Sequence, residues 1–178
     1  TPLTEITQDD FYTRDLDDAL LNGEIDLAIH SAKDLPDTIR EGLLVASRTP
    51  PPATWECLVT KDGTILEDLP AGAVIGISSE RRKSRLLELR PDLKVKDIRG
   101  NVPARVQQLD DGNYDGLILA AVGLIRLGMQ DRISQVFSVD RFPVMAGQGS
   151  LAVVIREEDS PLANFVEPLD FTDWGKRP

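Results

Sequence analysis

The chain has 178 residues, enough for one domain of ordinary size or for two small lobes with a hydrophobic core. Hydrophobic residues make up 41% and charged residues 28%, which is typical of a soluble globular protein rather than a disordered one. The net charge of −10 disfavours general nucleic-acid binding, and one histidine with one cysteine leaves too few ligands for a zinc site or a disulfide. No apolar run is long enough to predict a membrane span, and the first residues lack the pattern of a signal peptide.

Helices and strands alternate along the predicted chain. Leu16, Ala19 and Leu20 have helical spacing, so a helix is expected over 13–23, followed by a short apolar strand over 25–29. Downstream, the pattern predicts strands over 73–77, 93–98, 114–121 and 151–155, with helices over 78–91, 101–112 and 122–128. This alternation favours βαβ units and largely parallel sheets with helices on both faces, an α/β fold.

An internal repeat suggests that the chain holds two similar lobes. The segment LLNGEIDLAIHSA (20–32) matches LDDGNYDGLILAA (109–121), with Leu, Gly, Asp and Ile at equivalent positions. The alternative is that two ordinary helix–Gly–strand turns match by chance. If the repeat is real, the counterpart of the strand and helix at 74–89 would precede Thr1, so the first lobe would lack its opening strand.

Proline and glycine clusters predict where the lobes join. Three consecutive prolines at 50–52 disfavour both helix and central strand, and a Gly-x-Gly turn at 147–149 precedes the strand at 151–155. We therefore expect a first lobe of residues 1–52 and 146–167, a second lobe of residues 53–145, and a linker over 168–178. Two lobes joined by two crossings predict a ligand-binding cleft between them.

Basic residues concentrate after the predicted strands of the second lobe. Nine Lys/Arg and three acids lie between Arg81 and Arg105. Ser78, Ser79 and the first N–H groups of the next helix would form an anion site, with guanidinium groups beside it that suit planar carboxylates. The expected ligand carries several carboxylates, and the arginines concerned are Arg81, Arg82, Arg99, Arg105 and Arg126. Structural ion pairs with the acidic surface are the alternative.

The stretch AIHSAKDLP (28–36) places ionisable side chains at the end of a strand. Asp34 beside Lys33 could act as a general acid–base carboxylate, or could simply begin a turn into Pro36. His30 fits a hydrogen-bonded strand-end residue better than a catalyst. Cys57 lies in the apolar segment WECLV, where a thiol is usually inert packing.

Several motifs in the same order resemble the porphobilinogen deaminase (hydroxymethylbilane synthase) family. They span nearly the whole chain and read DLAIHSAKDLP, GISSERRKSRL, IRGNVPAR, YDGLILAAVGLIRLG and FPVMAGQGSLAVVIR. The resemblance implies two lobes similar to type-2 periplasmic binding proteins, followed by a third domain. It also implies a cytoplasmic transferase of porphyrin and heme biosynthesis that joins four porphobilinogen molecules, with release of ammonia, on a dipyrromethane cofactor attached to a cysteine.

The resemblance also assigns roles to individual residues. It makes Asp34 the catalytic carboxylate that contacts pyrrole nitrogens and assists proton transfer. It assigns the binding of the cofactor, or of acetate and propionate side chains, to Ser31, Lys33, Ser79, Arg81, Arg82, Arg99, Arg105 and Arg126. The expected partners are porphobilinogen and linear polypyrroles, with no metal, no nucleic acid and no membrane, and the protein is expected to be a monomer.

The chain departs from the family pattern at several places. It reads TQDDFY (7–12) where a glycine-rich loop is usual, and PPPATWEC (50–57) where an acidic-arginine turn is usual. The family's opening strand and its third domain with the cofactor cysteine are not found, and Cys57 lies in the wrong place to substitute. We therefore expect the chain by itself to be inactive. A non-catalytic lobe pair that binds polycarboxylates or pyrroles is the alternative function.

Overall fold

The computed structural model describes residues 13–170 and divides the chain into two compact units. The first unit runs to Pro52 and resumes at Met145, and the second runs from Ala53 to Val144. The chain therefore passes between the units twice. The TQDDFY segment at 7–12 and most of the expected linker at 168–178 lie outside the described residues, so both interpretations stay predictions.

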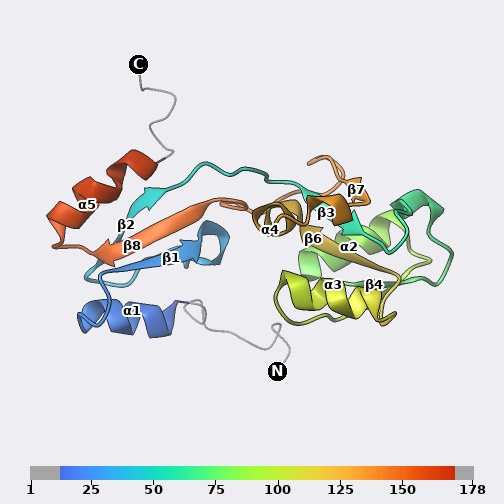
Figure 1. Ribbon diagram of the computed structural model, residues 1–178, viewed down its shortest axis with the longest axis horizontal. Coiled ribbons are helices and arrows are strands. Elements are labelled where there is room, and N and C mark those ends of the chain that lie inside the picture. The colour runs from blue at the N-terminus through green and yellow to red at the C-terminus, as the bar shows by residue number, and fades with distance from the viewer. Residues whose placement is uncertain (1–12, 171–178) are drawn as a thin grey trace, which may run out of the picture. The chain divides into compact units, whose positions relative to one another are not determined.

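The first unit is a three-stranded sheet with a helix on each face (Figure 1). Leu20 of α1 packs with Ala28 and Val154 on one face, whereas Val166 of α5 packs with Val153 on the other. The strand order is β1-β8-β2. The elements are α1 (Arg14–Leu21), β1 (Leu27–Ser31), η2 (Ala32–Asp34), β2 (Leu43–Arg48), β8 (Leu151–Arg156), α5 (Ser160–Val166) and η5 (Glu167–Leu169).

The second unit is a five-stranded sheet, again with helices on both faces. Leu86 of α2 packs with Leu58 on one face, while Leu109 of α3 and Leu124 of α4 pack with Leu117 on the other. The strand order is β5-β4-β6-β3-β7. The elements are β3 (Glu56–Val59), η3 (Leu66–Asp68), β4 (Val74–Gly76), α2 (Glu80–Leu89), β5 (Lys94–Lys96), α3 (Val102–Asp110), β6 (Gly116–Ala120), α4 (Ala121–Arg126), η4 (Gln130–Arg132) and β7 (Gln135–Val136).

The α/β class and the covering of each sheet by helices on both faces are confirmed, but the strand directions differ from the expected mainly parallel sheets. Only β4–β5 and β4–β6 pair in parallel, whereas β1–β8, β2–β8, β3–β6 and β3–β7 are antiparallel. Every antiparallel pair contains β3 or β8, the strands that follow the two passages between the units. Such a strand needs no helical crossover within its own sheet, so it can pair in either direction.

The internal repeat is visible in the backbone. The equivalent segments form helix–Gly–strand units, α1 to β1 and α3 to β6, and Leu20 and Leu109 are both fully buried. Gly23 and Gly112 both adopt a positive φ, at 71° and 83°, which favours glycine at the end of each helix. No helix among residues 13–170 is long and apolar enough to cross a membrane.

Candidate functional site

Three neighbouring parallel strands bring the predicted anion-binding residues to one edge of the second sheet. β4 lies between β5 and β6 and is parallel to both, so the carboxyl ends of the three strands share an edge. The segments that follow these strands begin the helices α2, α3 and α4. Helix N-termini at a shared edge present several N–H groups and a positive dipole end, which attract anions.

Arg105 joins two of these segments. Its Nη1 donates a hydrogen bond to Ser78 Oγ at 2.9 Å, and its Nε donates to the Gly100 carbonyl oxygen at 2.7 Å. The Asn101 side chain caps α3 by accepting a hydrogen bond from Ala104 N at 3.0 Å. The turn after β4 and the first turn of α3 are therefore held together by a guanidinium group, and the anion-binding role of this edge stays a prediction.

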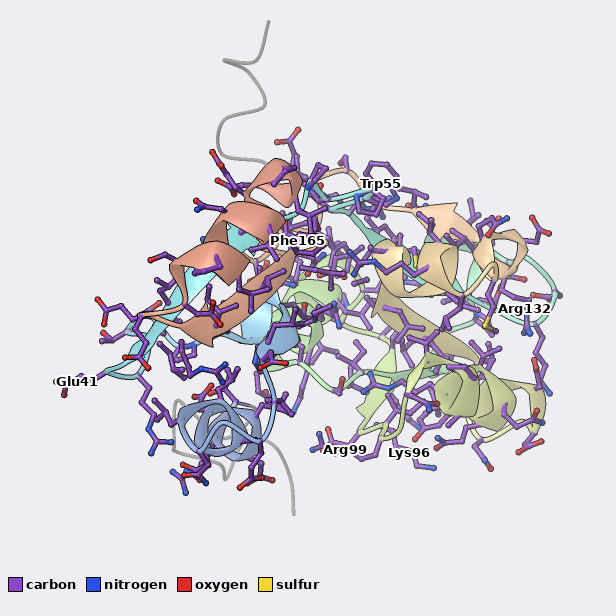
Figure 2. All side chains as sticks on the ribbon, turned by 60° about the vertical axis from the view of Figure 1, so that its left-hand side comes forward. Glu41, Trp55, Lys96, Arg99, Arg132 and Phe165 are labelled. Atoms are coloured by element: carbon purple, nitrogen blue, oxygen red, sulfur yellow. The ribbon has the colours of Figure 1, made fainter. Side chains whose placement is uncertain are left out.

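Arg99 offers hydrogen-bond donors at the same edge. Its side chain is 41% exposed, and its contact to Asp97 is long, at 3.5 Å. Its Nη1 is buried but has no hydrogen-bond partner in the described part of the chain. Figure 2 shows Arg99 projecting from the same edge of the second unit as Lys96, away from Arg132. A buried donor without an acceptor is costly, so this atom fits a site that a ligand carboxylate completes.

Ser79 and Arg126 also lie after the expected strands. Ser79 occupies the N-cap position of α2, but its hydroxyl makes no capping hydrogen bond. Arg126 is the last residue of α4 and is exposed. Arg126 therefore lies a full helix length away from the end of β6. Ser79, in contrast, lies close to the end of β4.

Arg81 and Arg82 are engaged inside the protein. Glu56, at the start of β3, is fully buried; Arg82 Nη2 lies 2.8 Å from its Oε2, and Arg81 Nη2 donates to its Oε1. Arg81 also donates to the Pro143 carbonyl oxygen. Burial alone would raise the pKa of the Glu56 carboxyl, but the charges and hydrogen bonds of Arg82 and Arg81 outweigh burial and hold this pKa below its usual range.

Glu56 is the residue of this edge that sequence analysis did not identify. The available signal was a lone acid inside the apolar segment WECLV, because a charge in a buried strand needs a partner. Its pairing gives Arg82, which is only 8% exposed, a structural role. The ligand-binding role expected for Arg81 and Arg82 stays a prediction.

The turn that carries Lys33 and Asp34 lies in the first unit. Ser31 ends β1, and Lys33 and Asp34 belong to the single turn η2; all three are half-buried. Leu35 is extended, as is usual before proline, and ends this turn. Asp34 has no hydrogen bond or ion pair with any of the described residues. Its carboxylate is therefore available for chemistry, and the cleft where it would meet the arginines of the second unit stays a prediction.

His30 and Cys57 are both buried. His30 is 7% exposed and faces Ala152 at the end of the β1–β8 pair, but its buried Nε2 has no hydrogen-bond partner in the described part of the chain, contrary to the hydrogen-bonded residue expected there. Burial and the nearby negative charge of Glu56 raise the pKa of the Cys57 thiol to about 12. The thiol is protonated at neutral pH, which confirms the interpretation of Cys57 as inert packing.

A separate cavity of about 320 Å³ lies at the opposite edge of the second sheet, lined by Lys61, Asp62, Thr64, Leu69, Pro70, Gly112, Tyr114 and Asp115. Its acids are already occupied, because Asp115 accepts from Val74 N at 2.7 Å and Asp62 accepts from Thr64. This cavity therefore offers less unused polar chemistry than the edge that carries Arg99 and Arg105.

Comparison with known proteins identifies a family. The family model described as "Porphobilinogen deaminase, dipyromethane cofactor binding domain" matches residues 1–164. A porphobilinogen deaminase of Chlorobium chlorochromatii is 41% identical over 96% of this chain and 54% of its own length. One of Geobacillus sp. is 39% identical over 94% of this chain and, again, 54% of its own length. The chain spans about half the length of the curated relatives it matches.

Solved structures support the two-lobed fold. A periplasmic substrate-binding protein of an ABC transporter from Coxiella burnetii matches with a TM-score of 0.58 at 19% identity, covering 92% of this chain and 78% of its own. A putative methionine-binding lipoprotein from Bacillus subtilis matches with a TM-score of 0.55 at 15% identity, covering 88% and 74%. At these identities the likeness concerns the fold alone, and it confirms the periplasmic-binding-protein type.

The buried ion pair predicts a strong dependence of stability on Glu56. Because Glu56→Gln leaves Arg82 buried without a counter-ion, we expect it to lower the free energy of unfolding by about 3–5 kcal/mol at pH 7. Glu88→Gln is the matched control, since Glu88 forms an exposed pair with Arg85 and should change stability little. Urea denaturation monitored by circular dichroism measures both variants.

The contribution of Glu56 to the free energy of unfolding depends on pH with a definite sign. The folded-state pKa of Glu56 is depressed, so its contribution is complete above the unfolded-state pKa of about 4.3 and is lost as the pH falls through the folded-state pKa. The difference between wild type and Glu56→Gln should therefore shrink below about pH 4. A difference that stays constant down to pH 3 would show that Glu56 is not ionised in the folded protein.

Proposed function

Because the chain belongs to the porphobilinogen deaminase family, we propose that it forms the dipyrromethane- and substrate-binding part of a hydroxymethylbilane synthase. The reaction is the joining of porphobilinogen units with loss of ammonia, in tetrapyrrole biosynthesis. The observation that carries the proposal is the shared carboxyl edge of β5, β4 and β6, where Arg105 bridges Ser78 and Gly100 beside the unsatisfied Nη1 of Arg99.

The chemistry of this edge fits a dipyrromethane. Such a molecule carries several carboxylates, and planar guanidinium groups bind carboxylates through paired hydrogen bonds. Arg99, Arg105 and Ser79 would hold acetate and propionate side chains. Arg81 and Arg126 would extend this surface, while Arg82 remains paired to Glu56. When bound, a dipyrromethane supplies the end to which pyrrole units are added.

Asp34 would supply the acid–base chemistry. Pyrrole coupling develops positive charge on the ring and releases protons, so it requires a carboxylate that can stabilise the charge and accept a proton. The Asp34 carboxylate is half-buried and has no partner among the described residues, so it can do both. Lys33, beside it on the same turn, and Ser31, at the end of β1, would help to orient the ligand.

The same proposal covers the location, the oligomeric state and the partners of the protein. A cytoplasmic monomer that acts on small molecules fits the family, and the net charge of −10 disfavours a nucleic-acid partner. A lobe pair that binds pyrroles without catalysis is the alternative function. The two are distinguished by whether the protein, in the form that binds the pyrroles, also converts porphobilinogen.

Arg99 and Arg105 should contribute to the affinity for a dipyrromethane that carries acetate and propionate groups. A charge-assisted hydrogen bond contributes roughly 1.5–3 kcal/mol, so Arg99→Ala or Arg105→Ala should each weaken binding about tenfold or more. Arg132→Ala is the matched control, because Arg132 pairs with Asp110 at the other end of α3. Isothermal titration calorimetry measures the dissociation constants. Unchanged affinity in both site variants would refute the carboxylate site.

Asp34 should be essential for turnover and dispensable for folding. In a form of the protein that converts porphobilinogen, Asp34→Asn should lower kcat about 100-fold or more, because the amide cannot accept the proton or stabilise the charge. The melting temperature should be unchanged. Asp37→Asn, three residues further on and exposed, is the control and should retain full activity. Full turnover by Asp34→Asn would instead make Asp34 a turn residue.

Cys57 should not carry the cofactor. With a thiol pKa of about 12 and no exposed surface, it should form no adduct when the native chain is incubated with porphobilinogen. Iodoacetamide should label Cys57 only after the chain is unfolded in urea, which shows that burial is the cause. Intact-mass and peptide mass spectrometry, with Ehrlich's reagent for pyrroles, measure both reactions. A pyrrole adduct on Cys57, or porphyrin formed by the chain alone, contradicts this prediction.

A further inference from the structure

The loop of residues 145–150 lies directly against the turn that carries Asp34. The Ala32 N–H donates a hydrogen bond to the Ser150 carbonyl oxygen at 3.0 Å. The loop also has internal hydrogen bonds, from Gln148 N to the Met145 carbonyl oxygen and from Ser150 N to the Gly147 carbonyl oxygen, both 3.1 Å. The contact between loop and turn is thus made by backbone atoms of two ordered segments.

Gly147 is the point of closest approach. A Cβ at this position would lie 3.0 Å from the Ala32 carbonyl carbon and 3.1 Å from Lys33 N. These atoms belong to the Ala32–Lys33 peptide bond, so no side-chain rotation can relieve the overlap. Gly147 is itself exposed, so it is not required for packing of a core. Because Gly147 has no side chain, the turn can lie at its observed position.

We propose that Gly147 is a positioning residue that fixes the orientation of the Asp34 carboxylate through the Ala32–Lys33 peptide, an inference that rests on the role proposed above for Asp34. The η2 turn is only three residues long, so a displacement of its first peptide is passed to Asp34. No described residue hydrogen-bonds the Asp34 carboxylate, so its direction comes from the backbone. The residues before and after the turn, Ser31 and Leu35, are extended and confine the displacement to the turn.

Gly23 provides a matched control for backbone strain. It has a φ of 71°, compared with 73° for Gly147, and lies in the same unit. A Cβ at Gly23 would meet nothing within 4 Å. Gly23→Ala and Gly147→Ala therefore impose the same left-handed strain on an alanine, and only Gly147→Ala also pushes on the turn.

Amide hydrogen exchange tests the contact itself. Compared with Gly23→Ala, Gly147→Ala should speed exchange of the Ala32 N–H about tenfold or more, and leave the β8 amides equally protected. If Gly147→Ala proves too unstable to measure, the Gly147→Ala/Ala32→Gly double variant removes the Ala32 Cβ and loosens the turn, and should restore folding. Equal Ala32 exchange in Gly147→Ala and Gly23→Ala, or failure of the double variant to fold, overturns the proposal.

A double-mutant cycle tests whether Gly147 acts through Asp34. With the dipyrromethane acid as probe, Gly147→Ala should weaken binding about tenfold, and this loss should disappear when Asp34 is already alanine. Gly23→Ala should have no effect in either background. An equal loss in both backgrounds would show a purely structural role and overturn the proposal. If Asp34→Ala alone leaves binding unchanged, the proposed role of Asp34 fails, whereas the exchange result still decides whether Gly147 holds the turn.

Discussion

Burial of the Glu56 carboxylate constrains how β3 and α2 of the second unit are held together. A fully buried carboxylate is costly unless cations are fixed beside it, and Arg82 and Arg81 provide them. The pairing ties the start of β3 to the first turn of α2. Arg81 extends the same link to the Pro143 carbonyl oxygen, close to the second passage between the units. The start of α2 is thereby fixed at the proposed anion-binding edge.

The parallel arrangement of β5, β4 and β6 gathers the residues of the proposed ligand site at one edge. Because the three strands point the same way, everything that follows them gathers at one end: Ser78, Ser79, Arg99 and the first turn of α3. Two kinds of arginine then lie near one another. Arg82 is 8% exposed and pairs with an internal carboxylate, whereas Arg99 is 41% exposed; each keeps one buried donor without a partner among the described residues. A ligand rich in carboxylates would complete the second kind without disturbing the first.

Sequence periodicity predicted the local structure well. The spacing of Leu16, Ala19 and Leu20, the Asn22–Gly23 pair and the apolar strands led to the correct helix–Gly–strand units, because these signals act over a few residues. The repeat of β1 in β6 followed from the same signals. The position of Arg99 and Arg105 close to the strand ends was also predicted, since strand ends of a parallel sheet meet at one edge, but their binding role stays a prediction.

What the sequence could not reveal depends on contacts between distant segments. The direction of β8 could not be predicted, because this strand arrives from the other unit and can pair in either direction, which no local pattern encodes. The pairing of Glu56 with Arg82 and the approach of Gly147 to Ala32 likewise require the folded chain. Arg82 does form a structural ion pair, but with the buried Glu56 rather than with the acidic surface that the alternative named.

The central claim is our proposal that the shared carboxyl edge of β5, β4 and β6 binds a ligand rich in carboxylates, and chemical-shift mapping tests it most directly. A dipyrromethane acid titrated into the isotopically labelled chain should shift the backbone amides of Ser79, Arg99 and Gly100, and these three amides should follow one binding curve. Shifts confined to the cavity around Lys61 would contradict the account.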